Sequence, residues 1–292
     1  MHTFPTPDPI TVTVEVGLGT VRIEAADRAD TTVEVRPTHP DKKADVTAAE
    51  QTRVDYANGR LSIKTPARGW RQFAPWGGNE SIEVQIQLPA GSEVRAEGGV
   101  LALHTSGRLG DCSCKTGMGD IDVEEAGAVH LTTAYGDVVV GRRVGPADIK
   151  SGSGAVRVGR IEGSAVIKNG NGDTWVGEVI GDLRVSAANG KITVGRAVAS
   201  VAAKTAYGDV SVGEVAHGAV VAQTAFGALE VSIREGVAAW LDLSTGFGTV
   251  YNDLDDAADP GSAAGTVEVR ASTACGDITI RRAPATVSGV EA

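Results

Sequence analysis

Residues Ala165–Asp182 read AVIKNGNGDTWVGEVIGD, and residues Val201–Gly218 read VAAKTAYGDVSVGEVAHG. Both stretches contain a Gly-Asp pair that is followed at the same distance by Val-Gly-Glu-Val. Variants of this pattern return along the chain from about residue 92 onward. A repeat of this kind indicates a protein built from stacked copies of one small unit.

One residue directly follows the key glycine of each copy and serves as a reference point. The reference residues are Asp120, Asp137, Ala155, Asp173, Lys191, Asp209, Ala228, Thr249 and Asp277. Their successive spacings are 17, 18, 18, 18, 18, 19, 21 and 28 residues, so the period is about 18. One and three positions after the reference residue the side chain is Val, Ile or Leu, with Thr174 and Asn252 as the exceptions.

This period, without any helical pattern inside it, predicts an all-β protein that forms a parallel β-helix, or β-solenoid, with coils of about 18 residues. We expect three short strands per coil, with valine filling a narrow interior and glycine at the tight corners. Regular turn signals also fit an antiparallel β-sandwich of short hairpins. The step of 18 residues, rather than 9, favours the solenoid.

The first 90 residues lack the repeat but contain strand signals. Residues 10–35 and 81–88 alternate between apolar and polar side chains, and Asn58-Gly59 predicts a type I′ turn in a hairpin over residues 52–65. We therefore expect residues 1–90 to form N-terminal strands and a hairpin that cap the solenoid. Residues 91–284 should form its coils, and residues 285–292 a disordered tail. The strand ITIRR at 278–282 is expected to close the far end, after a surface loop over residues 251–264.

Composition and charge narrow the possible partners and location. The 292 residues carry a net charge of −10, which opposes binding to nucleic acid or anionic lipid. No apolar run is long enough to span a membrane. The opening MHTFPTPDPITVTVEVGLG lacks the basic and apolar regions of a signal peptide. We expect a cytoplasmic protein with no nucleic-acid partner and no membrane span.

The opening PITVTVEVGLGTVRIEAADR, the repeated YGDV and NGD motifs, and the segments GNGDTWVGEV and TAFGALEVSIREG resemble the bacterial β-strand-repeat family labelled "putative adhesin". The resemblance covers nearly the whole chain. It implies a β-helical fold, related in style to the bactofilin-like solenoids. It brings with it no agreed biochemical activity and no catalytic residues.

The aspartates among the reference residues could form a column that binds calcium, as in nonapeptide β-rolls. Those rolls need the pattern GGxGxD twice per coil, whereas here one Asp follows Gly once per coil. Ala155, Lys191 and Ala228 interrupt the column. We therefore expect each Asp to bond the backbone of its own turn, and we expect no metal and no cofactor.

Two more columns precede the reference residue. The residues two positions before it are Met118, Tyr135, Ser153, Asn171, Asn189, Tyr207, Phe226 and Phe247. The residues four positions before it are Thr116, Thr133, Ser151, Asn169, Ala187, Thr205 and Thr224. We expect both columns to be inward-facing or corner stacks whose hydroxyl and amide groups pair along the axis. A polar, aromatic-lined groove for a sugar is the alternative.

Cys112 and Cys114 fall on the same side of one predicted strand. Together with His104 or His130 they could bind zinc, but the ligand spacing is poor and no second Cys pair follows. We expect the two cysteines to be small buried apolar residues.

The segment 66–79 interrupts the alternating pattern and concentrates aromatic and cationic side chains. Its candidate partner-binding residues are Arg68, Trp70, Arg71, Phe73 and Trp76. Trp and Arg dominate the energetics of protein interfaces. This segment either plugs an open end of the solenoid or forms a partner surface.

The motifs of a serine hydrolase elbow, a phosphate loop or a zinc protease are absent from the sequence. We therefore expect a non-enzymatic structural scaffold or protein-interaction module. Its partner would be another protein or a second copy, bound through an edge or end of the solenoid. The alternatives are a polymerising bactofilin-like cytoskeletal rod and a polysaccharide-binding or polysaccharide-cleaving β-helix.

Overall fold

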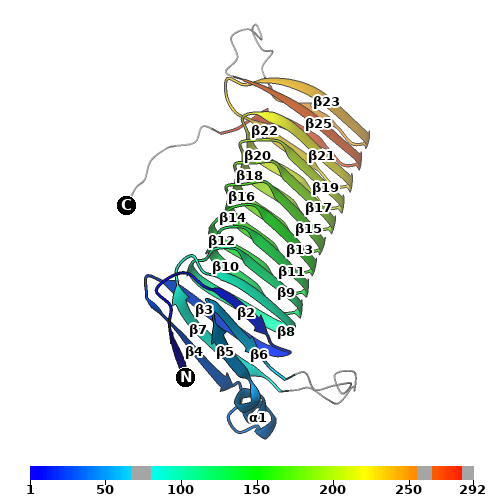
Figure 1. Cartoon of the computed structure of the whole chain (residues 1–292). Coiled ribbons are helices and arrows are strands. Elements are labelled where there is room, and N and C mark those ends of the chain that lie inside the picture. The colour runs from blue at the N-terminus through cyan, green and yellow to red at the C-terminus, as the bar shows by residue number, and fades with distance from the viewer. Residues whose placement is uncertain (67–79, 255–264, 285–292) are drawn as a thin grey trace. The chain divides into compact units, whose positions relative to one another are not determined.

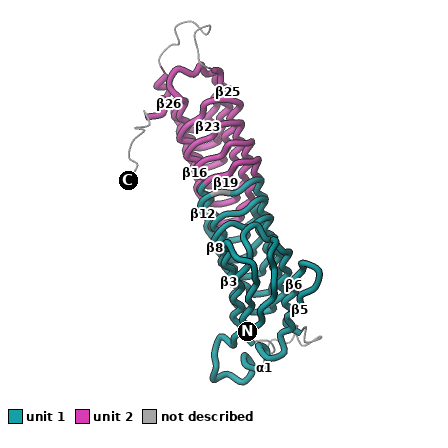
Figure 2. The backbone as a smooth tube through the Cα atoms, turned by 60° about the vertical axis from the view of Figure 1, so that its left-hand side comes forward, with its two compact units in different colours: residues 1–159 teal, residues 160–292 magenta. Residues whose placement is uncertain are grey.

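The computed structural model describes residues 1–66, 80–254 and 265–284 (Figure 1). The chain forms two compact units, residues 1–159 and 160–292, and we describe each by itself (Figure 2). Within each unit the strands of successive coils pair in parallel. The predicted all-β parallel solenoid is therefore confirmed, and the antiparallel sandwich is wrong. The expected change from cap to coils near residue 90 falls inside the first unit.

The first unit contains one helix and strands that begin near the N-terminus. Its elements are β1 (His2–Pro5), β2 (Thr11–Glu15), β3 (Leu18–Ala26), β4 (Asp30–Pro37), α1 (Lys43–Gln51), β5 (Arg53–Ala57), β6 (Arg60–Lys64), β7 (Ile82–Pro89), β8 (Glu93–Arg108), β9 (Cys112–Met118), β10 (Ile121–Ala126), β11 (Val129–Tyr135), β12 (Val138–Val144), β13 (Ala147–Ser153) and the start of β14 (Val156–Ile161).

The second unit consists of strands in its described part. These are β15 (Ala165–Asn171), β16 (Thr174–Val179), β17 (Leu183–Asn189), β18 (Ile192–Ala197), β19 (Val201–Tyr207), β20 (Val210–Val215), β21 (Gly218–Phe226), β22 (Leu229–Ile233), β23 (Ala238–Phe247), β24 (Val250–Asn252), β25 (Thr266–Cys275) and β26 (Ile278–Arg282).

Each coil has two strands, and not the three that we expected. β17 and β18 form one coil, and they pair in parallel with β19 and β20 of the next. The second strand bends at a glycine, where the pairing skips a residue between Val194 and Arg196. A Cβ on Gly195 would lie 2.5 Å from the carbonyl oxygen of Gly177. Glycine recurs there because the backbones of neighbouring coils approach too closely for a side chain.

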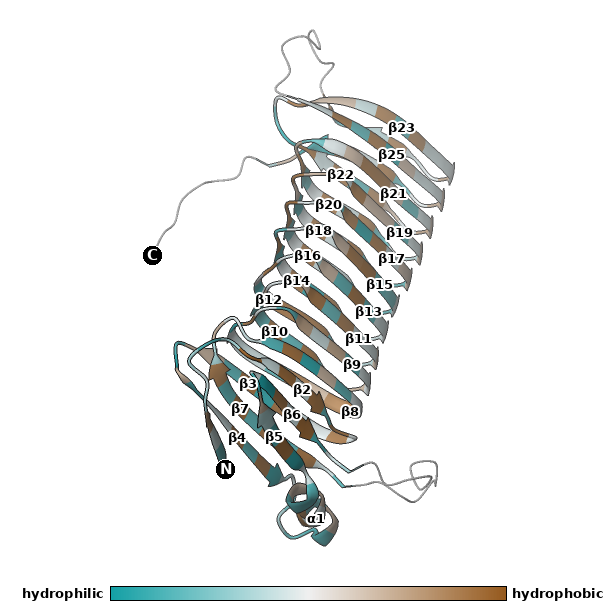
Figure 3. Ribbon diagram, in the orientation of Figure 1, coloured by the Kyte–Doolittle hydropathy of each residue, from teal (hydrophilic) through white to brown (hydrophobic). Residues whose placement is uncertain are grey.

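The interior of the coils is built by alternation along each strand, and hydrophobic and hydrophilic residues alternate in Figure 3. Val176, Val194 and Val212 follow one another at the same position of successive coils and are completely buried. A core of stacked β-branched side chains suits a narrow space between closely spaced strands.

The column four positions before the reference residue lies inside, as predicted, but its partners differ from the expected ones. The Thr224 hydroxyl donates to the carbonyl oxygen of Gly208 at 2.9 Å, and the Thr273 hydroxyl donates to that of Gly227 at 3.2 Å. These two hydroxyls thus satisfy backbone groups of the neighbouring coil instead of pairing with one another.

The N-terminal strands of the first unit pair in both parallel and antiparallel directions. β2 lies between β6 and β8, and β3 lies between β7 and β8, all in parallel. β5 adds to β6, β4 adds to β7, and β1 adds to β4, all antiparallel. Asn58 and Gly59, with φ of 52° and 74°, form the predicted turn between β5 and β6. α1, a helix of nine residues, lies between β4 and β5 in the chain.

The second unit ends in an order that the sequence did not predict. β25 lies between β21 and β23, and β26 lies between β22 and β24. The strand 278–282 therefore belongs to the last coil but one, and β23 with β24 forms the terminal coil. The expectation that ITIRR closes this end is wrong, because β25 and β26 insert between two coils that precede them in sequence.

Candidate functional site

The terminal coil of the second unit has one open side, which we call the open edge. Among the described residues, β23 pairs only with β25, and β24 pairs only with β26. The backbone N–H and C=O groups on the other side of both strands have no strand beside them in this part of the chain. Such an edge is a template for pairing with another β-strand.

The inward positions of the terminal coil are incompletely covered. Leu241 and Leu243 occupy the same positions as Val269 and Ala271 of the neighbouring coil, but they are only half-buried. Val250 is 40% exposed, whereas its neighbour Ile278 is completely buried. Within the ranges that the structure describes, the open edge therefore combines unpaired backbone with apolar side chains that other coils bury.

A second surface feature of this unit is a column that we call the aromatic ladder. It consists of Tyr207, Phe226, Cys275 and Phe247, which are neighbours on the adjacent strands β19, β21, β25 and β23. The rings of Tyr207 and Phe226 are parallel, with centroids 5.1 Å apart. Phe247 is 80% exposed, and Cys275 is exposed as well.

The ladder belongs to the column two positions before the reference residue, which we expected to be an inward-facing or corner stack. The side chains do not face inward: Thr205 is buried, whereas Tyr207 is 56% exposed. The alternation of buried and exposed side chains thus ends between these two residues, where residue 206 takes no part in the pairing. Asn189 and Asn171 extend the column, and the Asn189 amide donates to Asn171 Oδ1 at 2.7 Å. In the first unit the same column contains exposed Val100, Met118 and Tyr135, followed by the partly buried Ser153.

The aspartate column binds backbone, but not in the way that we expected. Oδ1 of Asp173 accepts from the N–H of Lys191 at 2.9 Å, and Oδ1 of Asp209 accepts from the N–H of Ala228 at 2.8 Å. In the first unit Asp120 accepts in the same way from Asp137 N–H at 2.8 Å. Each carboxylate thus links its own coil to the next and does not cap its own turn. Any residue except proline can supply the donor N–H, so Lys191 and Ala228 can occupy this column.

Charged side chains form another column in the second unit, in which basic and acidic residues alternate. Glu178 lies between Arg160 and Arg196, at 2.9 and 3.3 Å, and Glu214 lies between Arg196 and Arg234, at 3.6 Å from each. Exposed ion pairs of this kind stabilise a protein only slightly. The two glutamates of this column are each paired with two arginines.

Cys112 and Cys114 are buried on β9 as expected. Burial raises the pKa of both thiols to about 12. His104 lies on the outer side of β8, 4.0 Å from Asp122, and is not brought together with the thiols. Among the described residues, no group of three His, Cys, Asp or Glu side chains is arranged to hold a metal ion.

A cleft of about 450 Å³ lies in the first unit. Its lining includes apolar Leu18, Val100 and Ala102, and polar His39, Lys42 and Ser81. These three polar residues also contact the buried carboxylate of Asp45. Its oxygens lie 3.0 Å from the His39 ring and 3.1 Å from the Lys42 ammonium, and one accepts from the Ser81 N–H at 3.1 Å. Desolvation raises the pKa of Asp45, but these hydrogen bonds outweigh it and lower the pKa to about 2. The carboxylate is engaged in holding the loop before α1.

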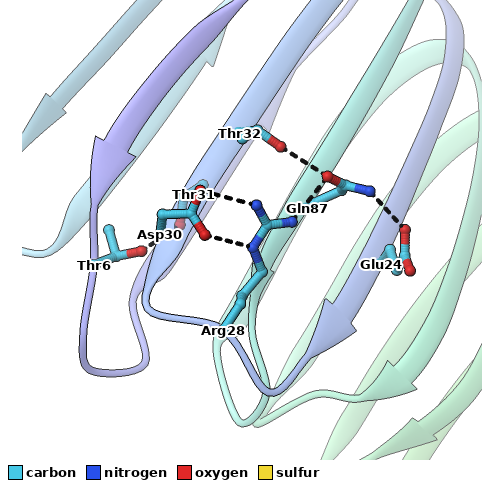
Figure 4. A network of polar contacts seen from close by, with 7 residues as sticks. All are labelled: Thr6, Glu24, Arg28, Asp30, Thr31, Thr32 and Gln87. Carbon is cyan, nitrogen blue, oxygen red and sulfur yellow. Dashed lines mark hydrogen bonds and ion pairs between the residues drawn. The ribbon is translucent and has the colours of Figure 1, made fainter.

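A polar network near the start of β4 also has a structural role (Figure 4). Arg28 donates to both carboxylate oxygens of Asp30, at 3.0 and 3.1 Å, and to Gln87 Oε1 at 2.9 Å. The Gln87 amide donates to Glu24 at 2.9 Å. The hydrogen bond from Arg28 lowers the pKa of Asp30. The network ties β3, β4 and β7 together.

Arg68, Trp70, Arg71, Phe73 and Trp76, the candidate partner-binding residues, lie outside the described residues. The sequence predicted the column that contains Tyr207, Phe226 and Phe247, and partner binding at an edge or end of the solenoid. It did not predict that these rings are exposed, that Cys275 lies among them, or that β23 and β24 form the open edge. The only sequence signals of these features were the lengthening of the repeat to 21 and 28 residues and the aromatic residues at one repeat position.

The fold and these surfaces can be compared with known proteins. The model of one protein family, Toastrack DUF4097, matches residues 10–281. The chain belongs to this family. No curated protein matches the Toastrack chain significantly. No helix in the described ranges is both long and apolar enough to cross a membrane.

Several solved structures are similar to this Toastrack chain. A "putative lipid binding protein" from Parabacteroides distasonis is 14% identical with a TM-score of 0.42, and the match covers 97% of this chain and 96% of that one. A "putative adhesin" from Bacteroides fragilis is 13% identical with a TM-score of 0.35 and coverage of 96% and 95%. A "putative adhesin" from Parabacteroides merdae is 12% identical with a TM-score of 0.35 and coverage of 97% and 95%.

Proposed function

We propose that this Toastrack protein is a non-enzymatic interaction module that associates with a second copy of itself through the open edge. The observation that carries the proposal is the terminal coil, where β23 and β24 lack an outer neighbour among the described residues and their inward side chains are incompletely covered.

The physical drive for this association comes from both backbone and side chains. β23 is ten residues long, and strands of such length with an unpaired side readily add another strand. Pairing would also cover Leu241, Leu243 and Val250, each of which gains roughly 1.5–3 kcal/mol when taken fully out of water. Only part of this gain is available here, because the leucines are already half-buried.

The partner that fits the open edge most simply is a second copy of this chain. A two-fold axis would place β23 of one copy antiparallel to β23 of the other, so that one surface serves both partners. The outermost cap strands of the first unit suit such pairing less well. β1 has four residues and ends in Pro5, and β5 carries Arg53 and Asp55. A closed dimer is therefore favoured over the bactofilin-like filament.

The test is size-exclusion chromatography with light scattering over a wide range of protein concentration. The wild type is expected to change from the monomer mass of 29.9 kDa to twice that value as concentration rises. Leu243→Lys should remain monomeric, because the ammonium group would be buried without a partner in the dimer. Ser272→Lys, on the paired strand β25, is the matched control and should dimerise. A wild type that is monomeric throughout, or one that forms filaments, would contradict the proposal.

A further inference from the structure

The aromatic ladder lacks one ring. Tyr207, Phe226 and Phe247 supply rings on three of four adjacent strands, and Cys275 occupies the strand between Phe226 and Phe247. The Cys275 side chain is exposed and much smaller than a ring. We infer that the space above Cys275, between the rings of Phe226 and Phe247, is a binding slot for a small planar aromatic molecule.

The spacing of the strands carries this inference. Neighbouring strands lie about 4.8 Å apart, so Phe226 and Phe247, two strands apart, are separated by about 10 Å along the ladder. A ring inserted at Cys275 would therefore lie about 5 Å from each. Tyr207 and Phe226 already stack at 5.1 Å, within the range that aromatic pairs prefer.

The exposure of the two rings points to a ligand rather than to packing within the protein. Phe226 is 51% exposed and Phe247 is 80% exposed, although apolar rings gain free energy on leaving water. A planar guest would cover one face of each ring at once. The slot is a single strand wide, which is too small for the contact area that a stable protein interface needs. A free small molecule is therefore the occupant.

The column itself shows that the backbone accepts a ring at this position. Phe226 and Phe247 precede and follow Cys275 on the adjacent strands, in the same register. Cys275→Phe should therefore fold and complete the ladder. Cys275→Ser keeps the slot open with a side chain of nearly the same size, and it is the matched control.

The experiment is a fluorescence titration with thioflavin T, a planar aromatic dye, in 0.5 M NaCl to screen attraction to the acidic protein. We expect the wild type and Cys275→Ser to bind the dye equally. Cys275→Phe and Phe247→Ser should each bind at least about tenfold more weakly, as for the loss of a central contact residue. Trp175→Ser removes an exposed ring outside the ladder and should bind as the wild type does.

Two further measurements, thermal unfolding and displacement of the dye by indole, test whether the dye binds in the slot. Cys275→Phe should raise the melting temperature by about 2 °C, because the added ring stacks on both sides. Free indole should displace the dye from the wild type. Dye binding that is unchanged in Cys275→Phe, no dye binding at all, or displacement only by a tryptophan-containing peptide and not by indole would overturn the inference. Leu243→Lys should leave dye binding unchanged, which separates this site from the proposed dimer interface.

Discussion

The carboxylate of Asp173 and the backbone of Lys191 are joined across two coils: Asp173 Oδ1 accepts from the Lys191 N–H at 2.9 Å, although the residues are 18 positions apart. The same bond links Asp209 to Ala228 and Asp277 to Thr249 in this unit. The Asp173 side chain therefore connects two coils. The Lys191 side chain has no part in this bond, because Lys191 donates through its backbone N–H.

Asp173→Ala should lower the free energy of unfolding by about 1 kcal/mol, because one charge-assisted hydrogen bond at the surface is lost. Lys191→Ala should change it by less than about 0.5 kcal/mol, because only its backbone N–H is used. Urea unfolding followed by circular dichroism measures both. Equal losses in the two variants would show that the bond between Asp173 and the next coil is unimportant.

Gly190→Ala should destabilise the second unit by at least about 2 kcal/mol. Gly190 has φ of +128°, and a Cβ there would lie 2.2 Å from the carbonyl oxygen of Gly172. Gly17→Ala serves as the control, because no atom lies within 4 Å of the added Cβ. Thermal unfolding of both variants tests the prediction, and similar melting temperatures would argue against the close approach of the coils.

The lowered pKa of Asp45 predicts that the folded protein loses stability in acid. Its pKa in the folded protein is about 2, below the ordinary value of 3.8, so the folded state favours the ionised carboxylate. This contribution is complete above about pH 4 and disappears as the pH falls through 2. Asp45→Asn should therefore be less stable than the wild type at pH 5, and the difference should shrink toward pH 2.

Melting temperatures of both proteins between pH 5 and pH 2 measure this effect. Asp41→Asn, at an exposed position in the loop before α1, should show almost no difference from the wild type across the range. A gap between Asp45→Asn and the wild type that stays constant down to pH 2 would contradict an ionised Asp45 in the fold.

The three cysteines should differ sharply in reactivity. Burial raises the pKa of Cys112 and Cys114 to about 12, so almost none of either thiol is ionised at pH 8, whereas Cys275 is exposed. Ellman's reagent should modify one thiol per native chain quickly and three in 6 M guanidinium chloride. Rapid modification of two or three thiols in the native protein would place Cys112 or Cys114 at the surface.

The period of about 18 residues predicted the coils, because each repeat presents the same small and β-branched residues at the same inward positions. The direction of the Tyr207 side chain could not be read from this pattern. Positions 205 and 207 fall on one face in a regular strand, but in the structure Thr205 is buried and Tyr207 is exposed, so the alternation ends between them. The sequence also did not predict that Asp173 bonds to the next coil. An Asp after a corner glycine can accept from its own turn or from the next coil, and the repeat pattern is the same in both cases.

The order of the last strands could not be predicted from the repeat for another reason. The repeat predicts what each strand looks like but not which neighbour it chooses, because β22 fits β24 and β26 alike. The lengthening of the repeat after Ala228 was the one sign that the order changes there. The candidate site depends on this choice, because it makes β23 and β24 the outer coil.

The insertion of β25 and β26 has a consequence for how the chain is made. A ribosome releases β23 and β24 before the two strands that separate them from β21 and β22. The nascent chain must therefore hold β23 and β24 apart, or dock them early on β21 and β22 and later release them. Folding here cannot simply follow the order of synthesis, and this end of the protein is where a translating chain would most need protection from aggregation.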